Sequence, residues 1–499
     1  MGGTIHLDKI WELLKFNPSD TLLFHSSLFF FLFFGFLLLY NFSAKHKNAR
    51  FFLIILFSLY FYYKSAGYLA GILIVSAAVN FFFGAIIHRT PYGGLRRFYF
   101  ILALFINLGI LAYFKYTNFV IQIINGIRES QLEPLEIFLP IGISFYTFKA
   151  MSYIIDIYME MMEPTKSFRN FCVFIFFFPN IQLGPIERAA NFLPQLEEDY
   201  ELTNKDIGKA LFLISAGLLK LSLISDYLNA NFVSQIFDWP ERYTGFQNLL
   251  ATYAYTLQLY CDFSGYSDLA IGIALMMGYK LMDNFNSPFK ATSVADFWRR
   301  WHISLSKWLL DYLFKPLQIK FRRLKMLSNV IALFVTFLIC GLWHDAGWNY
   351  IIWGALHGVY MSVGVLLQKP KNYIYNKLKI NNTKPLKFIQ GVITFHLIAF
   401  SFLIFRFSDL ERVKAVLSQI ISYFHGEIYM QFIEKLPLIS GLMLLGFIAH
   451  FIPVKAEEKI KDAIGNMPLI GKIILLSVVI FIAAQFKSAN PIAPTYFQY

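Results

Sequence analysis

Two histidines in this sequence occur where an imidazole could act on a hydroxyl group. His344 follows an apolar run that ends Cys340-Gly-Leu-Trp, and His302 lies between two tryptophan-containing turns. An ionisable residue at membrane depth is costly unless it is paired or functional. The usual histidine pKa of about 6.5 suits an imidazole to take a proton from an attacking hydroxyl near neutral pH. We therefore predict that His344 is a general base; a helix-end histidine satisfied by a backbone carbonyl is the structural alternative.

The segment around His302 has the pattern of an amphipathic helix at the membrane interface. Its apolar side contains Trp298, Trp301, Leu305, Trp308, Leu309 and Tyr312, and its other side contains Arg299, Arg300, Ser306 and Lys307, with Ser304 between them. Ser293 is a candidate N-cap, and Pro316 lies near the expected end of the helix. A membrane-surface anchor would have the same pattern, but it leaves the titratable His302 without a role.

A third polar stretch lies inside a long apolar segment, and its polar side chains are Asp262, Ser264, Ser267 and Asp268. Buried acids of this kind pair with Lys or Arg, orient a histidine, or line a polar tunnel. Beside His344, Asp345 could fix the tautomer of the ring, and Trp343 adjoins it. His357 fits a packing role or a hydrogen bond between helices.

Other kinds of site lack support in the sequence. Cys172, Cys261 and Cys340 show no metal-ligand spacing, so neither a disulfide framework nor a zinc site is expected, and we predict no metal. The sequence contains no G-x-x-x-x-G-K-[ST] and no G-x-S-x-G, which argues against nucleotide hydrolysis and a serine hydrolase.

The elements that must position these residues are transmembrane helices. Of the 499 residues, 57% are hydrophobic and 15% are charged, against about 25% charged in soluble domains. Apolar runs such as 21–40, 66–87 and 98–114 approach the roughly 18 to 20 residues that a crossing needs. We predict an all-α polytopic membrane protein with about 11 to 13 transmembrane helices.

Residues 140–358 differ from the N-terminal part because Gly, Pro, His, Asp and Arg interrupt their apolar helices. Broken helices persist in lipid only where they line a cavity or are buried in protein, so we expect the site here. A further helix break at 178–188 is compatible with a re-entrant segment.

Lysine and arginine counts predict the topology. Two acid-free basic loops, 315–325 and 369–387, should be cytoplasmic, and the net charge of +13 fits such loops better than nucleic-acid binding. Segments 327–343 and 348–367 would then go out and return. Three later crossings, at 388–407, 436–452 and 469–486, would leave the tail at 487–499 on the periplasmic or extracellular side.

Several motifs resemble the membrane-bound O-acyltransferase (MBOAT) family, in particular its branch of alginate and peptidoglycan O-acetyltransferase membrane subunits. The matching stretches are Leu139-Pro-Ile-Gly-Ile-Ser-Phe-Tyr-Thr-Phe, Gly184-Pro-Ile, Tyr260-Cys-Asp-Phe-Ser-Gly-Tyr-Ser-Asp, Asn284-Phe-Asn-Ser-Pro-Phe, Arg299-Arg-Trp-His-Ile-Ser-Leu-Ser-Lys-Trp and Gly341-Leu-Trp-His. The resemblance covers essentially the whole chain. It implies helices around a thinned core with a through-membrane tunnel, His344 as the catalytic residue, and His302 in the active region.

The resemblance also implies acetyl-CoA as donor substrate, with no tightly bound cofactor. The chain ends Pro494-Thr-Tyr-Phe-Gln-Tyr, which is similar to a terminal signature of relatives, so Tyr496 could carry the acyl group to an extracytoplasmic partner of the SGNH-hydrolase type. The alternative for this tail is a frayed hydrophobic terminus.

We therefore expect an acetyltransferase in a bacterial cytoplasmic (inner) membrane that serves a cell-envelope polysaccharide, peptidoglycan more than an alginate-like polymer. The alternatives are D-alanyl transfer to teichoic acid and a non-enzymatic transporter of an envelope precursor. The expected regions are N-terminal helices at 1–97, a catalytic core at 98–367, C-terminal helices at 368–486 and the tail at 487–499.

Overall fold

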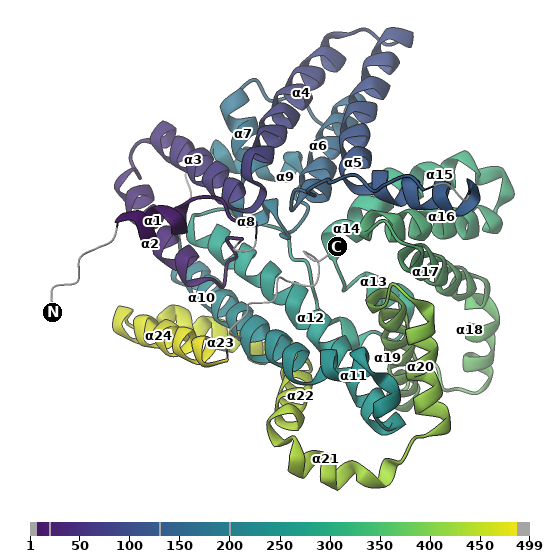
Figure 1. Ribbon diagram of the computed structural model, residues 1–499. Coiled ribbons are helices and arrows are strands. Elements are labelled where there is room, and N and C mark those ends of the chain that lie inside the picture. Colours follow the sequence, from purple (N-terminus) through teal and green to yellow (C-terminus); the bar gives the residue numbers. More distant parts are fainter. Residues whose placement is uncertain (1–6, 19–20, 129–130, 199–200, 487–499) are drawn as a thin grey trace. The chain divides into compact units, whose positions relative to one another are not determined.

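The computed structural model describes residues 7–18, 21–128, 131–198 and 201–486, and these ranges form helices and no strand (Figure 1). This confirms the all-α prediction. The predicted tail, including Tyr496, lies outside the described residues.

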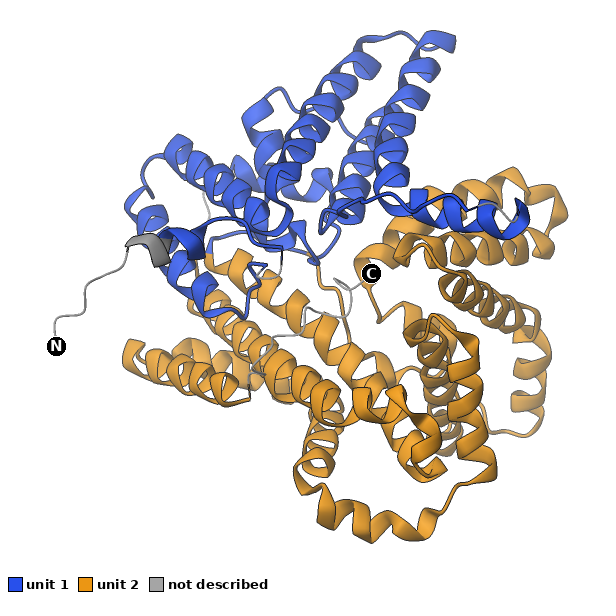
Figure 2. Cartoon of the chain, viewed as in Figure 1, with its two compact units in different colours: residues 1–201, 277–281 blue, residues 202–276, 282–499 orange. Residues whose placement is uncertain are grey.

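The chain divides into two compact units (Figure 2). Unit 1 comprises residues 1–201 and 277–281, and unit 2 comprises residues 202–276 and 282–499. These units are defined by packing, whereas the four regions expected from the sequence are defined by hydropathy and motifs.

Unit 1 is built around phenylalanine-rich helices. Its helices are α1 (Leu7–Leu14), α2 (Ser27–Phe42), α3 (Lys47–Ala66), η1 (Gly67–Leu69), α4 (Ala70–Arg89), α5 (Gly94–Arg128), α6 (Ile143–Tyr158), α7 (Phe168–Phe176), α8 (Phe178–Ile181), α9 (Ala189–Phe192) and η2 (Pro194–Leu196). The ring of Phe178 contacts rings of α2 and α3, and its backbone N–H donates to Ser58 Oγ at 3.1 Å. The helix break expected at 178–188 occurs after α8, in buried chain.

Unit 2 contains both histidines of interest. Its helices are α10 (Asn204–Leu219), π-helical η3 (Lys220–Asp226) and η4 (Asn229–Val233), α11 (Ser234–Asp238), η5 (Pro240–Arg242), α12 (Gly245–Met276), η6 (Pro288–Lys290), α13 (Val294–Trp298), α14 (Ile303–Leu309), π-helical η7 (Leu310–Phe314), α15 (Lys315–Lys320), η8 (Arg322–Leu324), α16 (Met326–His344), α17 (Trp348–Leu366), α18 (Gln368–Lys377), α19 (Lys384–Arg406), α20 (Leu410–Ser422), η9 (Gly426–Ile428), α21 (Tyr429–Lys435), α22 (Pro437–His450), α23 (Val454–Asn466) and α24 (Leu469–Gln485). The long helix α12 packs against α10, α19, α20 and α22, which makes it the centre of this unit.

The described residues contain five helices long and apolar enough to cross a membrane, or up to seven if each bent pair is one span. This is fewer than the 11 to 13 crossings expected. Two apolar helices, α2 and α24, are shorter. The expected crossing at 436–452 is a bent pair instead: α22 has 14 residues and lies at 102° to the helical segment before it. At about 1.5 Å per residue, α22 alone is too short for a hydrocarbon core about 30 Å thick.

The prediction of one continuous amphipathic helix from Ser293 to Pro316 is wrong. Ser293 is the N-cap, since its side chain accepts from Asp296 N, but α13 ends at Trp298. The chain then turns, and α14 begins after His302. Pro316 lies in the first turn of α15 instead of near a helix end. The helical spacing placed the tryptophans on one side, but it could not report this break, which tertiary contacts impose.

Candidate active site

The first candidate residue, His344, is the last residue of α16. Helix α17 begins four residues later at Trp348, so the backbone breaks beside the imidazole as predicted. The two helices pack closely because Gly341 and Gly354 face one another without side chains: a Cβ on Gly341 would lie 2.1 Å from the carbonyl oxygen of Tyr350. Small residues that permit such backbone approach are the usual basis of helix packing in membranes.

Aromatic rings surround the imidazole of His344. The ring centroids of Trp353 and Phe405 lie 5.1 Å and 5.3 Å away, nearly perpendicular to it, and that of Trp343 lies 5.1 Å away. His344 keeps 8% of its surface exposed, whereas His302 has none. Both residues are buried, and His344 is the less completely buried of the two.

His302 occupies the turn between α13 and α14 with a left-handed backbone, φ 43° and ψ 54°. A side chain other than Gly in this conformation costs free energy and persists only where surrounding contacts impose it. This turn lies outside the candidate spans, and burial lowers the pKa of His302 to about 3, so the ring is neutral near pH 7.

Asn284 supplies the contacts that hold this turn. Its backbone carbonyl accepts from Ile303 N at 2.9 Å. Its side-chain Oδ1 accepts from Ser304 N at 3.2 Å and from Ser304 Oγ at 2.8 Å. Its Nδ2 donates to Ser267 Oγ at 3.1 Å. Asn284 thus ties the His302 turn to α12.

Both histidines contact the indole ring of Trp343. The ring of Trp343 lies 5.9 Å from His302 and 5.1 Å from His344, centroid to centroid. On its other side His302 contacts Phe263 of α12 at 4.5 Å, edge to face. Three stretches that are far apart in the sequence therefore converge in unit 2.

The polar residues of α12 take different roles. Asp262, Ser264 and Ser267 are buried, and they flank the Phe263 that contacts His302. Asp268 pairs with Lys220 at 2.6 Å, which fits the prediction that a buried acid pairs with a cation.

The two arginines before His302 support the chain rather than the imidazoles. Both pair with Asp296, Arg299 at 3.3 Å and Arg300 at 3.1 Å. Arg300 also donates to the carbonyl oxygen of Asn286 at 3.3 Å, and the side chain of Arg299 is 71% exposed. Arg299 and Arg300 therefore stabilise the turn through Asp296 and Asn286 without contacting the imidazoles in the described structure.

The remaining predicted residues lie near the two rings without a direct role in the described contacts. Trp301 is buried, with its ring stacked on that of Phe297, and Ser306 Oγ donates to its carbonyl oxygen at 3.3 Å. Asp345 is half-buried, and in the described part of the chain it forms no hydrogen bond with the ring of His344.

His357 has the helix-to-helix role predicted for it. Trp298 Nε1 donates to its Nδ1 at 3.2 Å, so its proton lies on Nε2, which contacts Ser401 Oγ at 3.1 Å. That hydroxyl donates to the carbonyl oxygen of Ile398 at 2.7 Å. The ring thus joins α13, α17 and α19 behind the site.

Sequence reasoning missed several residues of the site: Asn284, Phe263, Trp353 and Phe405. Asn284 and Phe263 occur in stretches that resemble the family, which was a usable signal. Nothing in the sequence pattern indicated Phe405, which reaches His344 only because α19 packs against α17. Among the described residues, no cluster of three or more His, Cys, Asp or Glu side chains could hold a metal ion.

Comparison with known proteins identifies the family. A model of the membrane-bound O-acyltransferase family (MBOAT) matches residues 160–369, which include both histidines. The chain is 36% identical to the peptidoglycan O-acetyltransferase of Helicobacter pylori, covering 79% of each chain. It is 37% identical to the probable alginate O-acetylase AlgI of Pseudomonas aeruginosa, covering 78% of this chain and 73% of the relative.

A third relative, the teichoic acid D-alanyltransferase of Bacillus subtilis, is 33% identical over 53% of this chain and 68% of its own length. All three relatives are named as enzymes that transfer an acyl group, which argues against the transporter alternative. The chain belongs to the membrane-bound O-acyltransferase family and is a multi-pass membrane O-acyltransferase.

Proposed function

We propose that this enzyme transfers the acetyl group of acetyl-CoA, taken from the cytoplasm, to an acceptor hydroxyl on the other side of the membrane. The observation that carries the proposal is that the rings of His302, before α14, and His344, at the end of α16, both contact the ring of Trp343. A hydroxyl acceptor needs a base, and His344 is the more accessible imidazole of the pair.

In the proposed step, His344 takes the proton of the acceptor hydroxyl while its oxygen attacks the thioester carbonyl. The carbon–sulfur bond breaks, the acetyl ester forms, and the CoA thiolate leaves and takes the proton from the His344 imidazolium, which restores the base. General-base assistance supplies about 10² to 10⁴-fold of acceleration, so the fixed geometry of the site must supply much of the rest.

The proposed direction of transfer is inferred from the positions of the basic residues. Helix α16 begins directly after the basic stretch 315–325, and α19 begins within the basic stretch 369–387. Such stretches favour the cytoplasm. His344 lies at the opposite end of α16, and Phe405 near the end of α19 contacts it, so both ends belong on the extracytoplasmic side.

The final product is proposed to be an O-acetylated cell-envelope polysaccharide in a bacterium with this enzyme in its cytoplasmic membrane. The relatives named for peptidoglycan and alginate have nearly equal identity to this chain, so the comparison does not separate the two polymers. We keep peptidoglycan as the preferred product. D-alanyl transfer remains the second candidate, and the lower coverage of the relative named for it disfavours it.

Tyr496 is proposed as the first acceptor, from which an SGNH-hydrolase-type partner would take the acetyl group. Mass spectrometry of the C-terminal peptide tests this step after incubation with acetyl-CoA. We expect an added acetyl group in the wild type and none in Tyr496→Phe; an acetylated Tyr496→Phe peptide would exclude that hydroxyl as the carrier.

The donor is tested with purified protein in lipid vesicles. Labelled acetyl-CoA should transfer its label to protein or acceptor, while a D-alanyl thioester of a carrier protein should not. Transfer from the D-alanyl thioester alone would reverse the choice of donor.

A further inference from the structure

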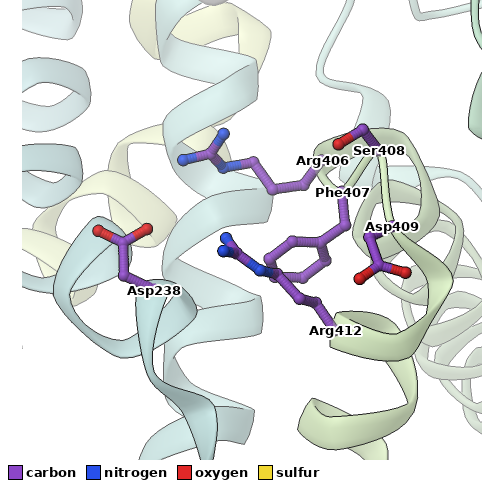
Figure 3. A pocket seen from close by; sticks show the side chains of 6 residues that line it. All are labelled: Asp238, Arg406, Phe407, Ser408, Asp409 and Arg412. Carbon is purple, nitrogen blue, oxygen red and sulfur yellow. The ribbon is translucent and has the colours of Figure 1, made fainter.

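A cavity of about 300 Å³ in unit 2 lies where the end of α11 faces the turn between α19 and α20 (Figure 3). Its lining residues are Asp238, Arg406, Phe407, Ser408, Asp409 and Arg412. The volume falls at the lower end of the roughly 300 to 1,000 Å³ typical of small-molecule sites. Almost all of these side chains are polar or charged, and none of them takes part in the proposed transfer step.

Two guanidinium groups point the same way into this cavity. Figure 3 shows Arg406 and Arg412 side by side, directed toward the α11 wall. Arg406 is steadied by the ring of Tyr255, 6.0 Å from its Cζ. Neither arginine forms an ion pair or side-chain hydrogen bond with any residue in the described ranges. Their donors are therefore available to an anion, which guanidinium groups bind with paired hydrogen bonds.

The two acids of the cavity are not paired with its two arginines in the described structure. Asp409 is the N-cap of α20, where its Oδ1 accepts from Glu411 N at 2.9 Å, and Figure 3 shows its carboxylate turned away from the arginines. Figure 3 shows Asp238 on the α11 side of the cavity, opposite both guanidinium groups, and among the described residues it forms no ion pair with either. A carboxylate placed there can accept hydrogen bonds from hydroxyl groups. The lining thus matches a ligand that carries both an anionic group and hydroxyls.

The cavity is linked to the proposed site of transfer through the end of α19. Phe405, whose ring contacts His344 at 5.3 Å, immediately precedes Arg406. Phe405 and Arg406 both belong to the end of α19 that is proposed to lie on the extracytoplasmic side. A ligand held in the cavity would therefore lie on the extracytoplasmic side, where the proposed partner passes the acetyl group from Tyr496 to the polysaccharide.

We propose that this cavity binds an acidic saccharide, with Arg406 and Arg412 holding its carboxylate and Asp238 accepting from its hydroxyls. The inference rests on the proposed function, because it assigns the cavity to the acceptor side of the same enzyme. It narrows the envelope polymer to one with carboxylates on or beside its sugar rings.

Direct binding tests the inference without the transfer reaction. The probe is trigalacturonate, and its methyl ester is the matched uncharged ligand. Titration calorimetry with the full-length protein, in a detergent without a sugar headgroup, should show that the acid binds and the ester binds at least tenfold more weakly. Binding of the acid should also weaken with added salt, because Arg412 is exposed and Arg406 is half-buried.

The double variant Arg406→Gln with Arg412→Gln should bind the acid about 10- to 100-fold more weakly, the effect of losing hydrogen bonds to a charged group. The double variant Arg322→Gln with Arg323→Gln is the control, since it removes the same two charges from the exposed segment η8. Unchanged binding by the double variant would overturn the proposal. Tighter binding of glycerol 3-phosphate, or of phosphatidylglycerol vesicles, than of trigalacturonate would also overturn it.

The His344→Ala variant separates this inference from the proposed function. It should bind trigalacturonate as the wild type does while losing acetyl transfer. If His344→Ala still transferred acetyl, the role of His344 as the base would be rejected. The binding inference would then still be tested separately, by the comparison of the arginine variants.

Discussion

The close approach of α16 and α17 should be essential for placing His344, and Gly341→Ala tests this directly. An added Cβ would lie 2.1 Å from the carbonyl oxygen of Tyr350 and 3.1 Å from the Cα of Gly354. Ordinary contact begins at 3.4 Å, so the helices must separate by about 1.3 Å to admit the methyl group. The obstructing atoms are backbone and cannot rotate away.

We expect this separation to displace His344, which lies three residues further along α16. A misplacement of about 1 Å can cost 10²-fold in rate, and overpacking of this kind costs roughly 1 to 3 kcal/mol of stability. The assay combines the initial rate of acetyl transfer in reconstituted vesicles with thermal unfolding of the same protein in detergent.

Gly364→Ala is the matched control on α17, because no atom lies within 4 Å of the added Cβ. It should keep wild-type activity and gain up to about 1 kcal/mol from the better helix propensity of Ala. If Gly341→Ala kept wild-type rate and stability, the reasoning from helix packing to the position of His344 would be refuted.

Three further predictions concern buried polar groups in unit 2. Asn284→Ala removes the acceptor for both donors of Ser304. We expect the free energy of unfolding to fall by about 2 to 4 kcal/mol and acetyl transfer to slow. Wild-type stability and rate would contradict the role given to the turn. Lys220→Met leaves the half-buried carboxylate of Asp268 without its partner, so stability should fall by less than the roughly 3 to 5 kcal/mol lost when a fully buried pair is broken. Adding Asp268→Asn should recover part of the loss, whereas no recovery would count against the pair. Burial lowers the pKa of His302 to about 3. Between that pH and about 6.5, the unfolded chain therefore binds more protons than the folded chain. Over this range, the free energy of unfolding should fall by about 1.4 kcal/mol for each pH unit of acidification. Unfolding temperatures at pH 5 and pH 7.5 should differ less in His302→Gln than in the wild type, and equal differences would reject this assignment.

Helix positions could be predicted where a single physical requirement dominates. An apolar run must cover the hydrocarbon core, so 327–343, 348–367 and 388–407 closely match α16, α17 and α19. The break after His344 was also predictable, because glycine and a polar cluster interrupt the run there. Amphipathic helices such as α20 and α23 were missed, since neither is apolar enough to suggest a crossing.

The turn at His302 could not be predicted from periodicity. Its left-handed backbone depends on Asn284, which lies 18 residues earlier and is itself tied to Ser267 of α12. Only tertiary contacts impose such a conformation. For the same reason, the sequence placed Trp298 and Trp301 at the membrane interface, whereas they are 5% and 1% exposed in the core of unit 2.

The two histidines of the candidate site could be predicted from the sequence, but the aromatic residues that surround them could not. His302 and His344 stand out because imidazoles are unusual in apolar sequence. Phe405 and Trp353 are two among many aromatic residues, and only the packing of α17 against α16 and α19 selects them.

The central claim is that His344 is the base that takes the proton of the acceptor hydroxyl. The most direct measurement is acetyl transfer from labelled acetyl-CoA by His344→Ala in lipid vesicles, with insertion and thermal unfolding checked in the same preparation. His396→Ala is the control, because that exposed histidine of α19 contacts Tyr253 and lies outside the site. The account predicts background transfer for His344→Ala and near wild-type transfer for His396→Ala. Wild-type transfer by a folded, inserted His344→Ala would contradict it.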